Sequence, residues 1–228
     1  MNSEFFSFEN LKKPLGDVTV SNYIGWSGLE IFKFIIPKGK SITNLLINDF
    51  KTYLVNKEKI FFTFDGDIEL KSEEFNFVLE KYDAIDFKYE QKYEFKSKKD
   101  SSIFMISSKD SKKINEKSKA FNFNKDVKKK DLWGGQIISW PYEGKELTLV
   151  LFELKQGFKF YDKGHPNQQV TWVVDGEMNF HANNNERVLN SDIGVSIGPN
   201  HTHGGISKGA MGFDAFFPKR IEEKYKNI

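Results

Sequence analysis

The feature that most constrains the fold of this chain is an internal repeat. The segment Phe-Asp-Gly-Asp-Ile-Glu-Leu at residues 64–70 matches Val-Asp-Gly-Glu-Met-Asn-Phe at residues 174–180, an offset of 110 residues. Upstream of these segments, residues 31–39 resemble residues 149–157. A repeat of this length exceeds the unit of a solenoid, so it predicts two duplicated domains.

Both copies consist mainly of strand signals. Short runs rich in Val, Ile, Phe, Thr and Trp alternate with Gly, Asn and Asp turns, whereas helical periodicity is scarce. Of the 228 residues, 39 % are hydrophobic, including 23 Phe and 8 Tyr, which is enough for two packed cores. We therefore expect an all-β chain with domains at residues 1–107 and 131–228. Residues 108–130 are polar and rich in lysine, and we interpret them as a solvated connector rather than a polyanion site.

Charge and composition narrow the class of partner. The net charge of +2 comes from 34 basic and 32 acidic side chains, so no global field attracts nucleic acid or an anionic membrane. The absence of cysteine excludes disulfides, thiolate nucleophiles and zinc-thiolate sites. The sequence has no signal-peptide pattern at its start and no apolar run of about 18 residues. We expect a cytoplasmic protein with a small-molecule partner.

The histidines are concentrated in one region. All four lie in the last third of the chain, and His181 is expected on an outer strand face. Imidazoles and a carboxamide brought together by neighbouring strands can bind a metal or move protons. The remaining candidates form two blocks: His165 and Gln169 in residues 157–169, and His201 and His203 in residues 192–205.

These two blocks resemble the two motifs of the cupin superfamily. The first cupin motif has a Gly, then His-x-His, Glu or Gln, six residues and Gly; the second ends in a late histidine. Gln169 is followed by six residues and Gly176, His165 matches the second histidine, and His203 matches the late one. The resemblance covers most of residues 132–218, and the repeat extends it to about residues 15–107. It implies two tandem cupin jelly-roll β-barrels, each with an internal ligand cavity.

The resemblance implies a metal site formed by His165, Gln169 and His203. Two imidazoles and an amide oxygen suit Zn, Ni, Mn or Fe, but a set without carboxylate holds a metal weakly. The first cupin histidine is replaced by Lys163, whose charge repels a divalent ion unless it points away or loses its proton. The metal is therefore expected to be weakly bound or absent. His201 is left open as a further ligand, a pocket acid or base, or a rim residue.

The amino-terminal copy departs further from the motif because it contains no histidine. At the offset of 110, the positions of Lys163, His165 and Gln169 correspond to Tyr53, Val55 and Lys59, and the late histidine falls near Glu94. These residues cannot form a metal site. We expect the first barrel to be degenerate, metal-free and largely structural.

In having Gln rather than Glu at position 169, the chain resembles small cupins that act on unsaturated uronates. This implies an enzyme that isomerises or ring-opens a small oxygenated substrate, such as a sugar acid, by metal-assisted or acid/base catalysis. His201, Lys163 and Tyr161 are the candidate proton-transfer groups, and Lys163 and Trp172 are the candidate substrate-binding groups. The alternative is a non-catalytic binding or structural bicupin. A duplicated chain can pair its own barrels, which predicts a monomer (an intramolecular pseudo-dimer) or a homodimer.

Overall fold

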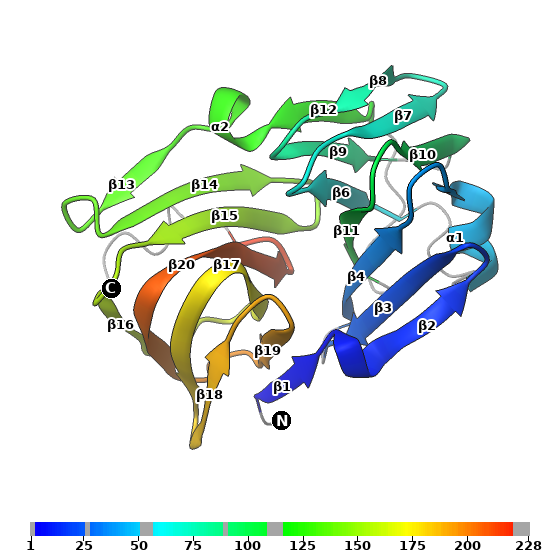
Figure 1. The fold of residues 1–228 in the computed structure, drawn as a ribbon. Coiled ribbons are helices and arrows are strands. Elements are labelled where there is room, and N and C mark those ends of the chain that lie inside the picture. Colours follow the sequence, from blue (N-terminus) through cyan, green and yellow to red (C-terminus); the bar gives the residue numbers. More distant parts are fainter. Residues whose placement is uncertain (1–2, 26–27, 51–56, 89–90, 109–115, 221–228) are drawn as a thin grey trace. The chain divides into compact units, whose positions relative to one another are not determined.

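The computed structural model describes residues 3–25, 28–50, 57–88, 91–108 and 116–220. The prediction of an all-β chain is confirmed, since strands carry the fold and the helices are short (Figure 1). The chain forms two compact units. Residues 7–24 and 28–127 make up the amino-terminal barrel, and residues 1–6, 25–27 and 128–228 make up the carboxy-terminal barrel. No helix among the described residues is long and apolar enough to cross a membrane.

The amino-terminal barrel is built from two antiparallel sheets. Its elements are η1 (Glu9–Leu11), β2 (Lys12–Leu15), β3 (Val18–Ile24), β4 (Leu29–Ile36), β5 (Ser41–Thr43), α1 (Asn44–Phe50), β6 (Lys59–Thr63), β7 (Ile68–Ser72), β8 (Asn76–Leu79), β9 (Asp83–Phe87), β10 (Tyr93–Ser97), β11 (Ser101–Ser108), β12 (Lys119–Asn122) and α2 (Phe123–Asp126). One sheet has the order β12-β9-β6-β11-β4-β3-β2, and the other has the order β5-β10-β7-β8.

Aromatic rings fill the core of the amino-terminal barrel. Phe61, Phe87, Tyr93 and Phe95 belong to one cluster of buried residues. The rings of Phe87 and Tyr93 stack with centroids 4.7 Å apart, and those of Phe61 and Phe95 are 4.8 Å apart. Because such rings bury a large apolar area, this core accounts for much of the high phenylalanine content.

The carboxy-terminal barrel is a single nine-stranded sheet. Its strands are β1 (Glu4–Ser7), β13 (Lys130–Leu132), β14 (Ile137–Glu143), β15 (Thr148–Leu154), β16 (Lys159–Asp162), β17 (Gln168–Ala182), β18 (Asn185–Leu189), β19 (Ile193–Ile197) and β20 (His203–Phe217). The order is β1-β19-β17-β20-β15-β14-β13, while β16 also pairs with β20 and β18 with β17.

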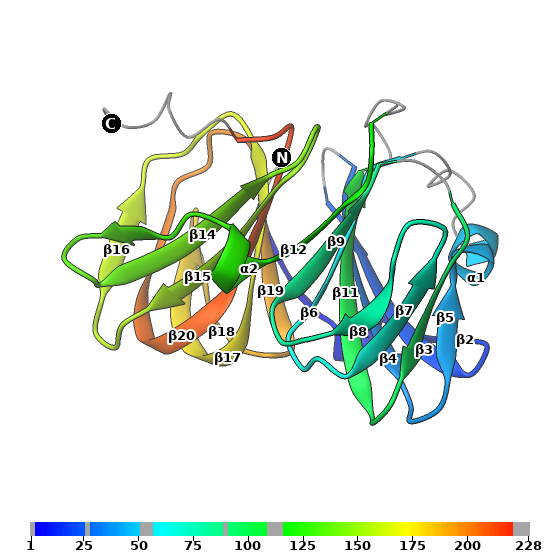
Figure 2. The same cartoon turned by 90° about the horizontal axis from the view of Figure 1, so that it is seen from above.

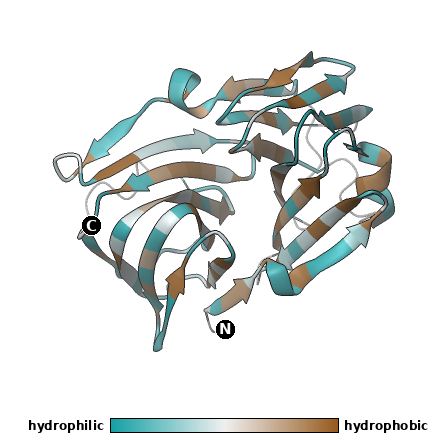
Figure 3. Cartoon of the chain, viewed as in Figure 1, coloured by the Kyte–Doolittle hydropathy of each residue, from teal (hydrophilic) through white to brown (hydrophobic). Residues whose placement is uncertain are grey.

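Two strands of 15 residues, β17 and β20, organise this barrel. They pair along most of their length and curve together (Figures 1 and 2). Hydrophobic and hydrophilic residues form alternating bands along them (Figure 3), as expected for strands with one face turned inward. Their register shifts near Gly176, where a Cβ would lie 1.9 Å from the Gly209 carbonyl oxygen. A glycine is required at this irregularity, which helps the two long strands to bend.

The repeat found in the sequence has the same strand pairing in both barrels. In the first barrel Phe61 pairs with Ile85, and 110 residues later Thr171 pairs with Val195. Likewise β7 pairs with β8 in the register in which the second half of β17 pairs with β18. The duplication therefore preserves hydrogen-bond register as well as sequence pattern.

The predicted domain boundaries need two corrections. Glu4–Phe6 belong to the carboxy-terminal barrel, since β1 is the neighbour of β19. Within the expected connector, residues 108–130, β12 pairs with β9 in the amino-terminal barrel. Each barrel thus gains an edge strand that pairs the backbone groups of β9 or β19. Local strand propensity does not reveal which sheet a short strand joins, so the sequence misplaced both.

Candidate functional site

The carboxy-terminal barrel contains a cavity of about 220 Å³. Its walls come from β13, β14, β15, β16, β17 and β20, together with the segment that follows β20. This volume lies below the range of about 300–1,000 Å³ typical of pockets for drug-sized ligands, so the cavity suits a small molecule. Its main charged and hydrogen-bonding side chains are Asp162, Gln169, Thr171, His203, Asp214 and Arg220.

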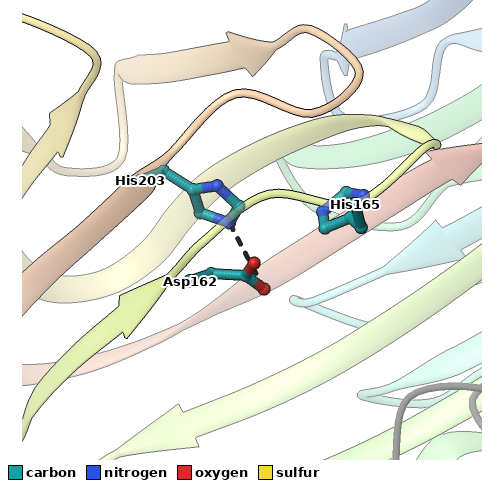
Figure 4. A group of neighbouring side chains, drawn as sticks. All are labelled: Asp162, His165 and His203. Atoms are coloured by element: carbon teal, nitrogen blue, oxygen red, sulfur yellow. Dashed lines mark ion pairs between the residues drawn. The ribbon is translucent and has the colours of Figure 1, made fainter. Parts of the chain in front are cut away.

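Asp162 and His203, which line this cavity, form with His165 a group that can hold a metal ion. The ligand atoms of Asp162, His165 and His203 all lie within 4.8 Å of one another (Figure 4). Asp162 ends β16 and pairs directly with His203 at the start of β20, and their side chains approach to 4.0 Å. The rings of His165 and His203 are nearly perpendicular, with centroids 5.5 Å apart. Strand pairing therefore brings together two of the three candidate ligands.

The loop after β16 positions the third candidate ligand, His165. The Gly164 N–H donates to Asp162 Oδ1 at 2.7 Å, and the Asn200 N–H donates to the His165 carbonyl at 2.7 Å. Gly164 has φ +105°, and a Cβ there would lie 2.6 Å from the Asn200 carbonyl carbon. Only glycine fits this conformation without strain. The tight turn directs His165 inward, where it is 3 % exposed.

The tautomer of His203 leaves a nitrogen for a metal. Its Nδ1 donates to the His201 carbonyl oxygen at 3.0 Å, so in the neutral ring Nε2 carries the lone pair. Nε2 is the atom that faces Asp162. A histidine ligand held through its other nitrogen by a backbone carbonyl is a common arrangement in metal sites.

His165 is neutral and has an unused lone pair. The Gln169 amide group donates to Thr171 Oγ1 at 2.8 Å and to Asp214 Oδ1 at 2.9 Å, so its oxygen accepts from His165 Nε2 at 2.8 Å. The buried Nδ1 of His165 finds no partner among the described residues. Burial lowers the pKa of His165 to about 4, so the ring is unprotonated at neutral pH, as a metal ligand must be. The donor set thus fits a divalent ion.

Asp214 is a second carboxyl group of unusual character in this cavity. Thr171 Oγ1 donates to its Oδ1 at 2.6 Å, and Thr171 is its direct neighbour across β17 and β20. Burial raises the pKa of Asp214, although the hydrogen bonds from Thr171 and Gln169 oppose this effect. A carboxyl with a raised pKa is a candidate for proton transfer.

Arg220 places a positive charge at the same cavity. Its backbone is fixed by two hydrogen bonds with Thr148 Oγ1, at 3.0 and 3.3 Å. Its guanidinium lies over the Phe216 ring at 5.1 Å, and its Nη2 lies 3.8 Å from Asp162 Oδ2. The side chain is only 22 % exposed.

The structure brings three of the predicted site residues together and leaves four outside the cavity. His165, Gln169 and His203 converge as expected. Tyr161 is 64 % exposed and stacks on His181 on the outer face, and Lys163 is exposed. Strand alternation explains Tyr161, because its neighbour Asp162 points into the barrel, while Lys163 follows the end of β16.

The other two predicted residues also lie elsewhere. His201 is half-buried, and its Nδ1 lies 3.1 Å from both Ser3 Oγ and Asn183 Nδ2. It precedes β20 in a turn, so the alternation that would have aligned it with His203 does not apply. Trp172 is fully buried against Phe213, on the face of β17 opposite to Thr171. It is a core residue rather than a substrate platform.

Sequence reasoning missed Asp162, Asp214 and Arg220. Motif spacing assigned the lost histidine position to Lys163, one residue from the carboxylate that faces the cavity. The alternation Phe160, Tyr161, Asp162 contained the correct signal, since Phe160 and Asp162 both line the cavity. No local pattern identifies Asp214 or Arg220, which reach the site through strand pairing and the course of the chain after β20.

The equivalent positions of the amino-terminal barrel are occupied differently. At the offset of 110, Gln169, Thr171 and His203 correspond to Lys59, Phe61 and Tyr93, and the last two belong to the aromatic core. Tyr53 and Val55, the other predicted counterparts, lie outside the described residues. The metal-free character of this barrel stays a prediction, supported by aromatic rings at cavity positions.

Comparison with solved structures shows a cupin fold. A cupin 2 conserved barrel domain protein from Leptotrichia buccalis matches with a TM-score of 0.65 and 15% identity, covering 95% of this chain and 97% of that one. The oxalate decarboxylase of Lactobacillus farciminis matches with a TM-score of 0.70 and 11% identity, covering 95% and 86%. That of Bacillus subtilis, a protein with Mn(II) centres, matches at 0.69 and 7% identity, covering 96% and 78%. No family model and no curated protein sequence matches the chain.

Proposed function

We propose that the carboxy-terminal barrel is a metal-dependent enzyme site that isomerises or ring-opens a small oxygenated acid. The proposal depends on one observation. The donor set of Asp162, His165 and His203 lies at the same cavity as a carboxyl with a raised pKa, Asp214, and a guanidinium, Arg220. The sugar acid expected from the sequence is one member of this substrate class.

Asp162 takes the place of the histidine that the motif lacks. Two imidazoles and a carboxylate suit Zn, Mn, Fe or Ni, and the carboxylate strengthens a set that would otherwise be neutral. Gln169 orients His165 through its hydrogen bond. A bound divalent ion would supply Lewis-acid polarisation of a substrate oxygen. Lys163 does not oppose the ion, because it points to solvent.

Asp214 replaces His201, Lys163 and Tyr161 as the candidate proton-transfer group. A carboxyl with a raised pKa holds a proton closer to neutral pH and can donate and recover it during an isomerisation. Thr171 and Gln169 fix one of its oxygens. In this cavity, a substrate oxygen near the reacting carbon would therefore lie close to Asp214, a positioned acid or base.

The metal centre is tested by adjacent substitutions. The purified chain is loaded with Mn(II), Zn(II) or Fe(II), desalted and assayed by elemental analysis. Asp162→Ala and His203→Ala should reduce the retained metal to background, whereas the neighbouring Lys163→Ala should leave it unchanged. Retention of metal by Asp162→Ala, or its loss in Lys163→Ala, contradicts the assignment.

A non-catalytic binding module is the second candidate. The connected hydrogen bonds from His165 through Gln169 to Thr171 and Asp214 organise the cavity wall by themselves. Asp214→Asn separates the two functions. In an enzyme it should lower kcat about 100-fold or more while ligand affinity persists. A metal-loaded protein that binds acids and turns none over is a binding module.

A further inference from the structure

The cavity has a polar end and an apolar end, because residue character changes along its strands. Gln169 and Thr171 occupy successive inward positions on β17, and Thr171 pairs with Asp214 on β20. Farther along the sheet from Asp214, β14 and β15 present Ile137 paired with Leu154. From Asp214 towards Leu154 the lining therefore becomes mainly apolar, with Ser139 on β14 as its hydrogen-bonding exception.

The opposite wall repeats this polarity. Asp162 pairs with His203, but two residues back Phe160 pairs with Gly205, which also pairs with Phe180. A Cβ on Gly205 would lie 2.6 Å from the Asn179 carbonyl oxygen, so glycine is needed here. The rings of Phe160 and Phe180 approach across it, with centroids 6.1 Å apart. Both rings line the cavity, and both are part of or packed against the barrel's hydrophobic core.

Arg220 is built into the polar end. Its backbone is fixed on Thr148, which lines the cavity, and its guanidinium is held against Phe216. A guanidinium presents donors in a planar fork that matches a carboxylate. The distance of 3.8 Å to Asp162 Oδ2 makes that contact an ion pair rather than a hydrogen bond. Asp162 therefore holds the Arg220 side chain at the polar end of the cavity through charge attraction.

We infer that the cavity binds a short carboxylic acid with an apolar chain, its carboxylate on Arg220 and its chain between Phe160, Phe180 and Leu154. This inference rests on the proposed function, since it specifies the substrate class of the same site. A volume of about 220 Å³ equals roughly seven waters at about 30 Å³ each, which suits an acid of about six carbons. The sugar acid expected from the sequence is therefore the less favourable member of the proposed class, because a polyhydroxylated acid of that size would place hydroxyls against Phe160, Phe180 and Leu154, whose side chains have no donors or acceptors.

Three acids test the inference by calorimetry on the full chain. Hexanoate carries both features, acetate lacks the chain, and galacturonate has the same carbon number with hydroxyls. A chelator is present, so that binding of a carboxylate to metal is not measured. Hexanoate should bind at least tenfold more tightly than either other acid. Equal affinity for acetate, tighter binding of galacturonate, or no binding of hexanoate overturns the inference.

The two arginines of the chain provide a matched pair of variants. Arg220→Gln should weaken hexanoate at least tenfold, and Arg220→Lys should weaken it less because the charge is kept. Arg187→Gln should have no effect, since Arg187 is exposed on β18 and lies over Phe5 rather than in the cavity. Unchanged hexanoate affinity in Arg220→Gln overturns the inference. Metal retention is measured separately. A protein that binds hexanoate selectively but retains no metal after loading would contradict only the proposed function.

Discussion

At His165, burial and metal binding require the same protonation state. The ring is 3 % exposed and bonded to Gln169, and burial lowers its pKa to about 4. A free histidine is half-protonated at a pH near 6.5, so the fold keeps the His165 ring unprotonated over a wider range of pH. The same burial makes this residue costly to protonate. The free energy of unfolding should therefore depend on pH through His165.

The free energy of unfolding should decrease as the pH falls from about 6.5 to about 4. In this window an unfolded histidine binds a proton while folded His165 does not, so acid favours the unfolded state, by at most about 3 kcal/mol. Urea denaturation with a chelator, at several pH values, measures this effect. His165→Asn should lose it. Asp214, whose raised pKa acts with the opposite sign, is present in both proteins and cancels; identical pH profiles would refute the prediction.

Among the elements, β1 shows how a few residues complete a distant sheet. Phe6 is 8 % exposed and packs on Gly194 of β19, where an added Cβ would lie 2.4 Å from the ring. Phe5 packs against the hydrophobic core of the same barrel. The glycine is needed for this close approach, so β1 and β19 are matched in shape as well as in pairing.

Phe6→Ala should destabilise the carboxy-terminal barrel by about 3 kcal/mol, because it leaves a void beside Gly194. Amide hydrogen exchange should accelerate in β19 while exchange in β9, in the other barrel, is unchanged. The exposed neighbour Glu4 is the control, and Glu4→Ala should change stability by no more than about 0.5 kcal/mol. Equal acceleration in β9 would contradict the assignment of β1.

On the scale of the whole molecule, duplication has produced two barrels with different interiors. One retains a cavity with hydrogen-bonding and charged side chains, and the other places Phe61 and Tyr93 at the positions of Thr171 and His203. Large rings exclude both an ion and a small ligand from the space they fill. The first barrel thus has aromatic packing residues at positions where the second has a hydroxyl and an imidazole.

The chain should therefore bind one equivalent of divalent metal tightly, not two. Elemental analysis after equilibration against a weak chelator measures the stoichiometry. His203→Ala should reduce it to zero, while Glu94→Ala, near the equivalent position of the first barrel, should leave one equivalent. Two tightly held equivalents per chain would show that the amino-terminal barrel also contains a site.

The sequence by itself determined the repeat, the strand content and three residues that a local motif encodes and that meet at the candidate site. Alternation and turn residues are short-range properties, so the offset of 110 predicted strand pairings that the structure contains. His165, Gln169 and His203 were identified for the same reason. Motif spacing alone, however, placed Lys163 where the strand directs Asp162 inward.

Only the tertiary structure decided what surrounds those three residues. Asp214 meets Gln169 across β17 and β20, and Arg220 reaches Asp162 from beyond β20, contacts between residues 45 and 58 positions apart in the chain. β1 and β12 likewise join sheets that their own sequences do not specify. Such contacts depend on which strands become neighbours, and that is a property of the folded barrel rather than of any local segment.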